Sequence, residues 1–105
     1  MTYQEIVEEM RKLIAKKDVS KVRGHLAYQF NITGEGEGAF YIEVKDKKAY
    51  VEPYEYYDRH AAFTCEAKVL FDIIEGKLDP VKAFEKKELM VEGDLGKALK
   101  LKDFI

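Results

Sequence analysis

The sequence predicts a single domain of the α+β class, and three features of the chain indicate it. An amphipathic helix pattern comes first, over residues 2–17. Three strand-like segments joined by short turns follow, over residues 25–52. Short helix patterns then alternate with two further strand-like segments. The 105 residues are the length of one domain, so we expect a single unit over residues 1–105.

Residues 2–17 carry the pattern of a capped helix. Thr2 and Glu5 have the spacing of a capping box, in which each side chain satisfies the backbone N–H of the other residue. Apolar side chains recur at the helical period, so this face is expected to dock on the core. They are Ile6, Val7, Met10, Leu13 and Ile14.

Three antiparallel strands are expected after a linker over residues 18–24. Apolar and polar residues alternate with period two from His25 onward, which indicates strands with one buried face. Turns at residues 34–38 and 46–47 are too short for a crossover helix, so neighbouring strands must be antiparallel. The third strand stops at Pro53, which cannot donate to a ladder. The inward residues are Leu26, Tyr28, Phe30, Ile32, Phe40, Ile42 and Val44.

The second half of the chain predicts two more strands and three helices. A short fourth strand is expected over residues 59–63, and Thr64 is a good N-cap for the helix that follows. Gly76 ends that helix, and Asp79-Pro80 begins the next. A last strand over residues 89–91 leads to a final helix that starts at Gly93-Asp94. The inward residues are Val69, Leu70, Ile73, Ile74, Val81, Phe84, Leu95, Ala98 and Leu99, and the apolar end of the chain is expected to dock.

Charge and composition exclude several classes of protein. A net charge of −2 with mixed signs lacks the basic face of a nucleic-acid-binding domain. No apolar run is long enough to span a membrane, and the start of the chain is unlike a signal peptide. Cys65 is the single cysteine, so no disulfide can form within the chain. We therefore expect a cytoplasmic protein.

No arrangement of side chains predicts covalent catalysis. Cys65 follows the expected cap Thr64, where a thiolate would gain from the helix N-terminus. An extended segment would hold His60 about 16 Å away, so Cys65 is expected to be structural. The two histidines, His25 and His60, do not form a metal-ligand cluster with it. The sequence therefore predicts neither an enzyme nor a cofactor nor a metal site.

Two glycine-containing segments are expected to have structural roles. Residues 34–38 alternate glycine with glutamate between two strands, so a hairpin turn is expected in place of a phosphate loop. Gly93 and Asp94 open a helix whose N–H groups could meet an anion, but Asp94 is expected to fill that place as the cap.

Tyr54, Tyr56 and Tyr57 suit either an interface or the partly exposed cover of one sheet end.

In order and spacing these segments resemble the sterol carrier protein type 2 family, the non-specific lipid-transfer fold. The resemblance covers nearly the whole chain. Its most specific part is the tail, where residues 76–84 read Gly-Lys-Leu-Asp-Pro-Val-Lys-Ala-Phe and residues 89–101 contain Leu-x-Val-x-Gly-Asp and Ala-Leu-Lys-Leu. The family usually has glycine where Lys87 stands, tryptophan where Phe40 stands, and Asp-Gly in place of Asp46-Lys47. A left-handed lysine costs ~1 kcal/mol, so the geometry of the turn at Lys87 stays open.

The resemblance implies a five-stranded, mainly antiparallel sheet covered by helices, with an apolar tunnel between sheet and helices. Different members hold sterols, fatty acids, acyl-CoA or phospholipid there. On this chain the expected tunnel lining is Phe30, Ile42, Val44, Val51, Phe63, Leu70, Ile73, Ile74, Phe84, Leu89, Val91, Leu95 and Leu99. The expected tunnel mouth or lid is Tyr54, Tyr56, Tyr57, Leu101, Phe104 and Ile105.

We therefore expect an intracellular lipid-binding or lipid-transfer protein that holds a fatty acid, acyl-CoA or another apolar, sterol-like lipid without covalent chemistry. The alternative is an accessory or interaction module of an enzyme, or of a lipid or quinone biosynthesis assembly, with a packed interior and a partner protein. Internal volume distinguishes the two hypotheses.

Overall fold

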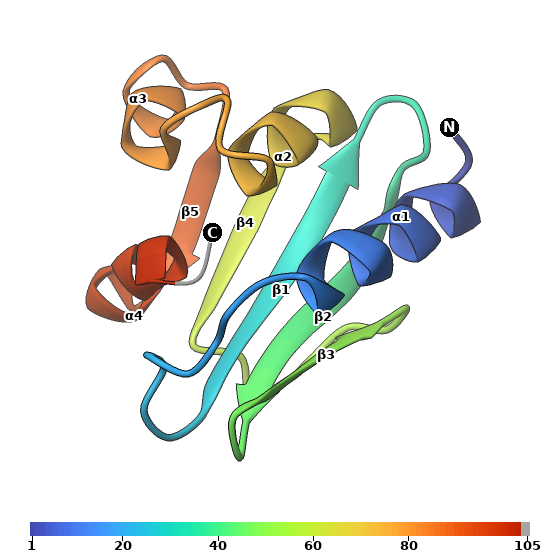
Figure 1. Cartoon of the computed structure of the whole chain (residues 1–105). Helices are drawn as coiled ribbons and strands as arrows, with labels where there is room; N and C mark the ends of the chain where they lie inside the picture. Colours follow the sequence, from blue (N-terminus) through green and yellow to red (C-terminus); the bar gives the residue numbers. More distant parts are fainter. Residues whose placement is uncertain (104–105) are drawn as a thin grey trace.

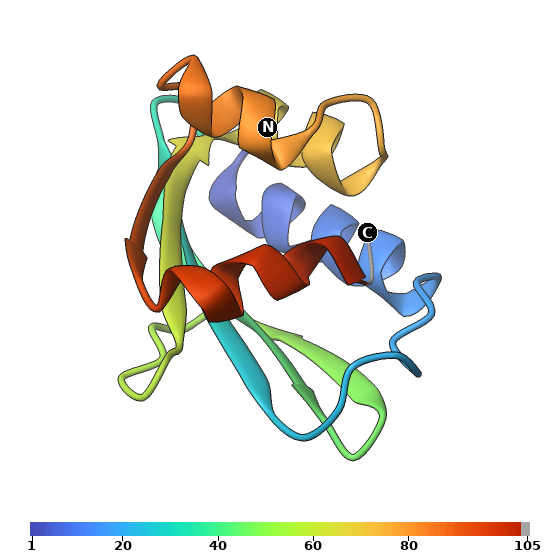
Figure 2. The ribbon, with the colours of Figure 1, turned by 90° about the vertical axis from the view of Figure 1, so that its left-hand side faces the viewer.

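The fold is a two-layer arrangement of a five-stranded sheet and helices, described over residues 1–103 by a computed structural model (Figure 1). Figure 2 shows the layers edge-on, with the helices on one face of the sheet. The elements are α1 (Tyr3–Ala15), β1 (Leu26–Thr33), β2 (Gly38–Lys45), β3 (Lys48–Glu52), β4 (Ala61–Glu66), α2 (Ala67–Ile74), α3 (Pro80–Glu85), β5 (Met90–Gly93), α4 (Leu95–Leu99) and the 3-10 helix η1 (Lys100–Asp103).

Helix α1 begins as the sequence predicts. The Thr2 hydroxyl accepts from Glu5 N–H, and the Glu5 carboxylate accepts from Thr2 N–H at 2.8 Å, which confirms the capping box. The predicted stripe is buried except for Leu13, which is partly buried. Arg11 extends across to β3, where its Nε donates to the carbonyl of Val51 at 2.9 Å. This helix therefore covers the β3 edge of the sheet.

The sheet has the strand order β3-β2-β1-β4-β5, and three of its four pairings are antiparallel. The predicted meander β1-β2-β3 is confirmed, and its second turn places Asp46 and Lys47 at φ of 51° and 62°. That conformation twists a two-residue hairpin in the same sense as its strands. The sheet is mixed, however, because β4 runs parallel to β1. The connection between β3 and β4 therefore crosses one face of the sheet, and the contacts of its Tyr56 with Glu43 and Tyr41 place it on the face opposite the helices.

The expected helix cap at Thr64 was wrong. Thr64 lies inside β4, and the N-cap of α2 is Glu66, whose side chain makes no capping hydrogen bond. The reason is the ladder with β1, which pairs Thr64 with Asn31 and continues to the end of β4. The Asn31 side-chain amide also donates to the Thr64 hydroxyl at 3.2 Å. Strand pairing satisfies the backbone here, so the capping preference of threonine has no effect.

The core lies between the sheet and the helices and is centred on three stacked aromatic rings. Phe30 on β1 lies between Phe40 on β2 and Phe63 on β4, with ring centroids 5.4 and 5.2 Å apart. The register aligns the three residues, since Phe30 pairs with both neighbours. All three side chains are buried. This stack connects the middle of the sheet to β4, the strand next to the edge strand β5.

The turn before β5 keeps a left-handed residue although no glycine is present. Lys87 has a φ of 64°, and the backbone N–H groups of Glu88 and Leu89 donate to the carbonyl of Ala83. These bonds fix the turn against the ~1 kcal/mol cost of left-handed lysine. Asp79 caps α3 by accepting from Val81 N–H at 2.8 Å, and Gly76 ends α2 at a φ of 78°. These termini confirm the expected helix boundaries.

Candidate functional site

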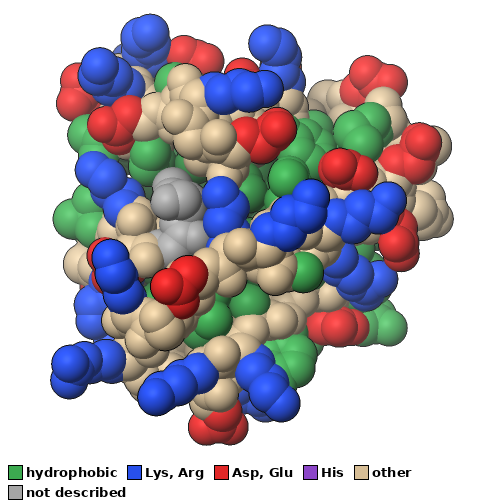
Figure 3. All heavy atoms as spheres, viewed as in Figure 1, with side chains coloured by type: hydrophobic (Ala, Val, Ile, Leu, Met, Phe, Trp, Pro, Cys, Tyr) green, Lys and Arg blue, Asp and Glu red, His purple; other side chains and the backbone are tan. Residues whose placement is uncertain are grey.

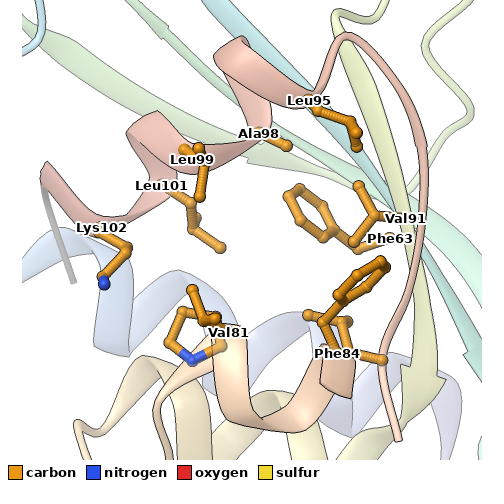
Figure 4. Close-up of a pocket in the computed structure, with 11 residues that line it drawn as sticks. Phe63, Val81, Phe84, Val91, Leu95, Ala98, Leu99, Leu101 and Lys102 are labelled. Carbon is orange, nitrogen blue, oxygen red and sulfur yellow. The ribbon is translucent and has the colours of Figure 1, made fainter. Parts of the chain in front are cut away.

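An apolar groove of about 190 Å³ lies at the β5 edge of the sheet, between α3, β5, α4 and η1 (Figure 4). Ten apolar residues and one charged residue line it among the described part of the chain. They are Phe63, Pro80, Val81, Phe84, Leu89, Val91, Leu95, Ala98, Leu99, Leu101 and Lys102. Figure 3 views the helix side of the molecule, where charged side chains of both signs leave apolar side chains visible between them.

The groove stays open because its walls are short. Helix α3 has six residues and α4 has five, and they lie at the two ends of β5 (Figure 1). The expectation that Phe84, Leu95 and Leu99 face the interior was wrong, because their exposed fractions are 49%, 59% and 58%. Ala83 and Ala98 are the buried residues of these two helices. The larger side chains form the rim of the groove instead.

The structure separates the expected tunnel lining into two groups. Six of those residues line the groove: Phe63, Phe84, Leu89, Val91, Leu95 and Leu99. The other seven belong to the packed core and do not line the groove: Phe30, Ile42, Val44, Val51, Leu70, Ile73 and Ile74. An enclosed tunnel is not shown within residues 1–103. The space available to a ligand is an open groove at the end of the sheet.

Of the residues expected at the tunnel mouth or lid, one lines the groove and three do not. Leu101 is 2% exposed and lines the groove from η1. Tyr54, Tyr56 and Tyr57 do not line it. Tyr56 contacts residues on the opposite face of the sheet, including the ring of Tyr41 at 4.9 Å. Phe104 and Ile105 lie outside the described residues.

Sequence reasoning missed a polar cluster on the face of the sheet that lacks helices. The Glu43 carboxylate lies 2.6 Å from His25 Nε2 and accepts from the Tyr56 hydroxyl at 2.8 Å. Burial pushes the pKa of Glu43 up, but these hydrogen bonds outweigh it and lower the pKa below its usual value. The bond to Glu43, followed by burial, raises the pKa of Tyr56 to about 12. The alternation of apolar and polar residues predicted His25 and Glu43 on the polar faces of their strands. The register of β1 with β2 brings the two side chains together.

His60 completes this end of the sheet as a hydrogen-bond acceptor. Its Nδ1 accepts from Ala27 N–H at 3.0 Å, so this nitrogen must be unprotonated. Burial lowers the pKa of His60, and nearby His25 lowers it further. A folded pKa below the unfolded value gives stability that is present above pH 6.5 and lost as the pH falls through the folded pKa.

We therefore expect the free energy of unfolding to decrease when the pH is lowered from about 7.5 to about 5. In His60→Asn, an amide oxygen that cannot be protonated in this range replaces Nδ1 as the acceptor. This variant is expected to lose that part of the pH dependence. Urea unfolding of both proteins at the two pH values measures the effect. An equal decrease in both would assign the pH dependence to another group.

Cys65 shows no sign of an activated thiol. Burial raises the pKa of Cys65 to about 12, and the side chain is buried in β4. Such a group is a thiol at neutral pH and lacks the thiolate that attacks carbonyl carbons.

Asp94 accepts from Lys97 N–H at 3.0 Å and so occupies the N-terminus of α4 as its cap, as expected. Residues 34–38 connect β1 to β2 in a hairpin, also as expected.

The sequence profile of the SCP-2 sterol transfer family matches residues 4–105. The chain belongs to this family. Lipid binding and transfer is the function that the family implies, and its domain is generally non-catalytic. No helix in the described part of the chain is long and apolar enough to cross a membrane.

The chain is similar in sequence to one curated protein and in fold to two proteins of known structure. The Hydroxysteroid dehydrogenase-like protein 2 of Xenopus tropicalis is 29% identical over 97% of this chain, which spans only 24% of that protein. Sterol Carrier Protein 2 Like 2 of Aedes aegypti has a crystal structure with a TM-score of 0.69 at 20% identity, covering 95% of this chain and 93% of that one. It also has a solution structure in palmitated form, with a TM-score of 0.67 at 20% identity, covering 98% and 93%. The ubiquinone synthesis protein UbiJ-SCP2 has a TM-score of 0.69 at 12% identity, covering 90% and 87%.

Proposed function

We propose that this SCP-2 family domain carries a fatty acid or another acyl lipid in the groove between α3, β5 and α4. One observation carries the proposal: apolar side chains form the whole lining except Lys102. An exposed apolar groove is costly in water, and a lipid chain removes that cost by covering it. The palmitated form of the Aedes aegypti relative supports an acyl chain as the ligand.

The number of buried methylenes sets a condition on binding. Burying about six methylenes would gain roughly 5 kcal/mol. The loss of translational and rotational freedom, at least about 4 kcal/mol, nearly cancels that gain. About fifteen methylenes would gain roughly 12 kcal/mol, so tight binding requires most of a long acyl chain to lie against the apolar lining of the groove.

The ligand enters and leaves unchanged in this proposal. Helix α4 and η1 lie at the end of the described chain beside the edge strand β5, where local opening costs least. The proposal needs no nucleophile, because shielding a lipid from water is a matter of burial. We infer a cytoplasmic location, since a single cysteine offers no internal disulfide.

A charge on the groove rim tests the site. In Leu95→Asp, a carboxylate replaces a rim side chain that is 59% exposed, so the fold is expected to survive. The new aspartate lies in the first turn of α4, where an acidic side chain is favourable. Losing about two methylene contacts is expected to weaken binding of a fluorescent fatty acid at least about tenfold.

Met90→Asp is the matched control, because Met90 is also 59% exposed but does not line the groove. We expect it to change the dissociation constant less than about twofold. Fluorescence titration of the delipidated variants measures both. Equal affinities for the two variants would place the fatty acid elsewhere on the protein.

A second candidate is an accessory module that binds a partner protein through the same apolar rim. The packing of seven expected tunnel residues in the core favours it. UbiJ-SCP2, described as a ubiquinone synthesis protein, supports such a setting for the fold. Titration of stripped protein with fatty acid, acyl-CoA, sterol and quinone separates the candidates. Binding of none of the four would favour the accessory module.

A further inference from the structure

The groove has one charged residue in its lining, and that residue stands at one end. Lys102 belongs to η1, while the other ten lining residues are apolar. Figure 4 shows Phe63, Phe84 and Val91 together at the far end of the groove from Lys102, with Leu101 between them. Lysine covers apolar surface with its methylene stem and keeps its ammonium group near water. The groove lining is therefore apolar, and at one end the stem of Lys102 leads to an ammonium group on the solvent side.

The Lys102 ammonium has no carboxylate partner within ion-pair distance among residues 1–103. Within residues 1–103 only two lysines form ion pairs, Lys68 with Asp72 at 3.8 Å and Lys77 with Glu75 at 3.9 Å, so Lys102 differs from the other unpaired lysines by its place in the groove lining. Lys102 is thus a cation at the end of an apolar groove whose described surroundings leave it available to an anion. An ammonium is a compact single charge with three donors, which suits one carboxylate.

We propose that Lys102 binds the carboxylate of a fatty acid, whose acyl chain extends along the groove toward Phe63 and Phe84. This rests on the proposed function, because it assumes that the groove holds an acyl lipid. It narrows the ligand to one that is apolar along its length and carries a single negative charge at one end. A fatty alcohol fills the same apolar surface but leaves the ammonium without a charged partner.

Charge number favours a carboxylate over the phosphates of acyl-CoA. The groove lining provides one cation, and Asp103, next to Lys102 in η1, adds a negative charge close by in the chain. A ligand with several phosphate charges would find no second cation in the lining. A fatty acid matches the single ammonium with a single charge.

The experiment compares palmitate, hexadecanol and palmitoyl-CoA on three delipidated proteins: the natural sequence, Lys102→Gln and Lys100→Gln. Lys100 is also in η1 and exposed, but it does not line the groove, so it is the control for total charge. We expect the natural sequence to bind palmitate about tenfold more tightly than hexadecanol. Lys102→Gln is expected to lose that preference with hexadecanol affinity unchanged, and Lys100→Gln to keep it.

The outcomes separate the two levels of the proposal. If the natural sequence binds none of the three ligands, the proposed function itself fails. If palmitate and hexadecanol bind equally, or if Lys102→Gln weakens both alike, the groove binds lipid but Lys102 does not bind the carboxylate. Loss of palmitoyl-CoA binding in Lys102→Gln with palmitate unaffected would overturn the assignment in favour of a phosphate. Circular dichroism of each variant confirms that the fold is intact.

Discussion

Replacing Phe30 by alanine is expected to lower the free energy of unfolding by about 3–5 kcal/mol. Phe30 is 1% exposed and stacks between Phe40 and Phe63 at interplanar angles of 17° and 16°. Its removal leaves a cavity in the middle of three adjacent strands, whose backbones cannot close on it. A domain of this size has a total stability of only about 5–15 kcal/mol.

Urea unfolding followed by circular dichroism measures this loss. Tyr57→Ala is the control, since it removes an aromatic ring that is 94% exposed, and its effect is expected to stay within about 0.5 kcal/mol. A loss below about 1 kcal/mol for Phe30→Ala would contradict the packing of the stack, because such a value is typical of sites that can collapse.

Replacing Gly93 by alanine is expected to destabilise the fold by about 2 kcal/mol or more and to weaken lipid binding at the same time. Gly93 ends β5 with a φ of 100°, and a Cβ there would lie 2.7 Å from the carbonyl oxygen of His60. That carbonyl also accepts from Asp94 N–H at 2.9 Å, which holds the start of α4 against β4. Any shift that relieves the contact therefore moves a wall of the groove.

Gly76→Ala is the matched control for backbone strain alone. Gly76 has a φ of 78°, and a Cβ there would meet no atom within 4 Å. Its cost is expected to be about 1 kcal/mol with lipid affinity unchanged. Thermal unfolding and fluorescent fatty-acid titration of both variants give the comparison. Equal losses of stability and unchanged binding in both would contradict the role of Gly93 in positioning α4.

Much of the fold could be predicted because local patterns decided it. The Thr2 capping box, the Asp79 and Asp94 caps and the meander all depend on residues close together in the chain. The pattern of residues 76–101 indicated the family, and the family implied a five-stranded sheet. Lys87 kept the left-handed turn without glycine, because two backbone hydrogen bonds to Ala83 hold it.

What could not be predicted depends on contacts between distant segments. Thr64 reads locally as a cap, and only its pairing with Asn31 makes it a strand residue. The apolar residues of α3 and α4 have the pattern of core residues, but two helices this short at the two ends of an edge strand leave Phe84 and Leu99 at the surface. Periodicity reports which face of a helix is apolar, and the neighbouring elements determine whether that face is covered.

The polar cluster illustrates the same limit. His25 and Glu43 are far apart in the sequence, and each has an ordinary explanation on the outer face of a strand. Their 2.6 Å contact follows from the antiparallel register of β1 with β2. Tyr56 joins them because the connection from β3 to the parallel strand β4 must cross that face.

Intermolecular NOEs between palmitate and methyl-labelled protein test most directly whether the groove is the lipid site. We predict contacts from the palmitate chain to the methyl groups of Val91, Leu95 and Leu99, which line the groove. Contacts instead to the core residues Leu70, Ile73 and Ile74, or no saturable contacts at all, would contradict the groove as the lipid site.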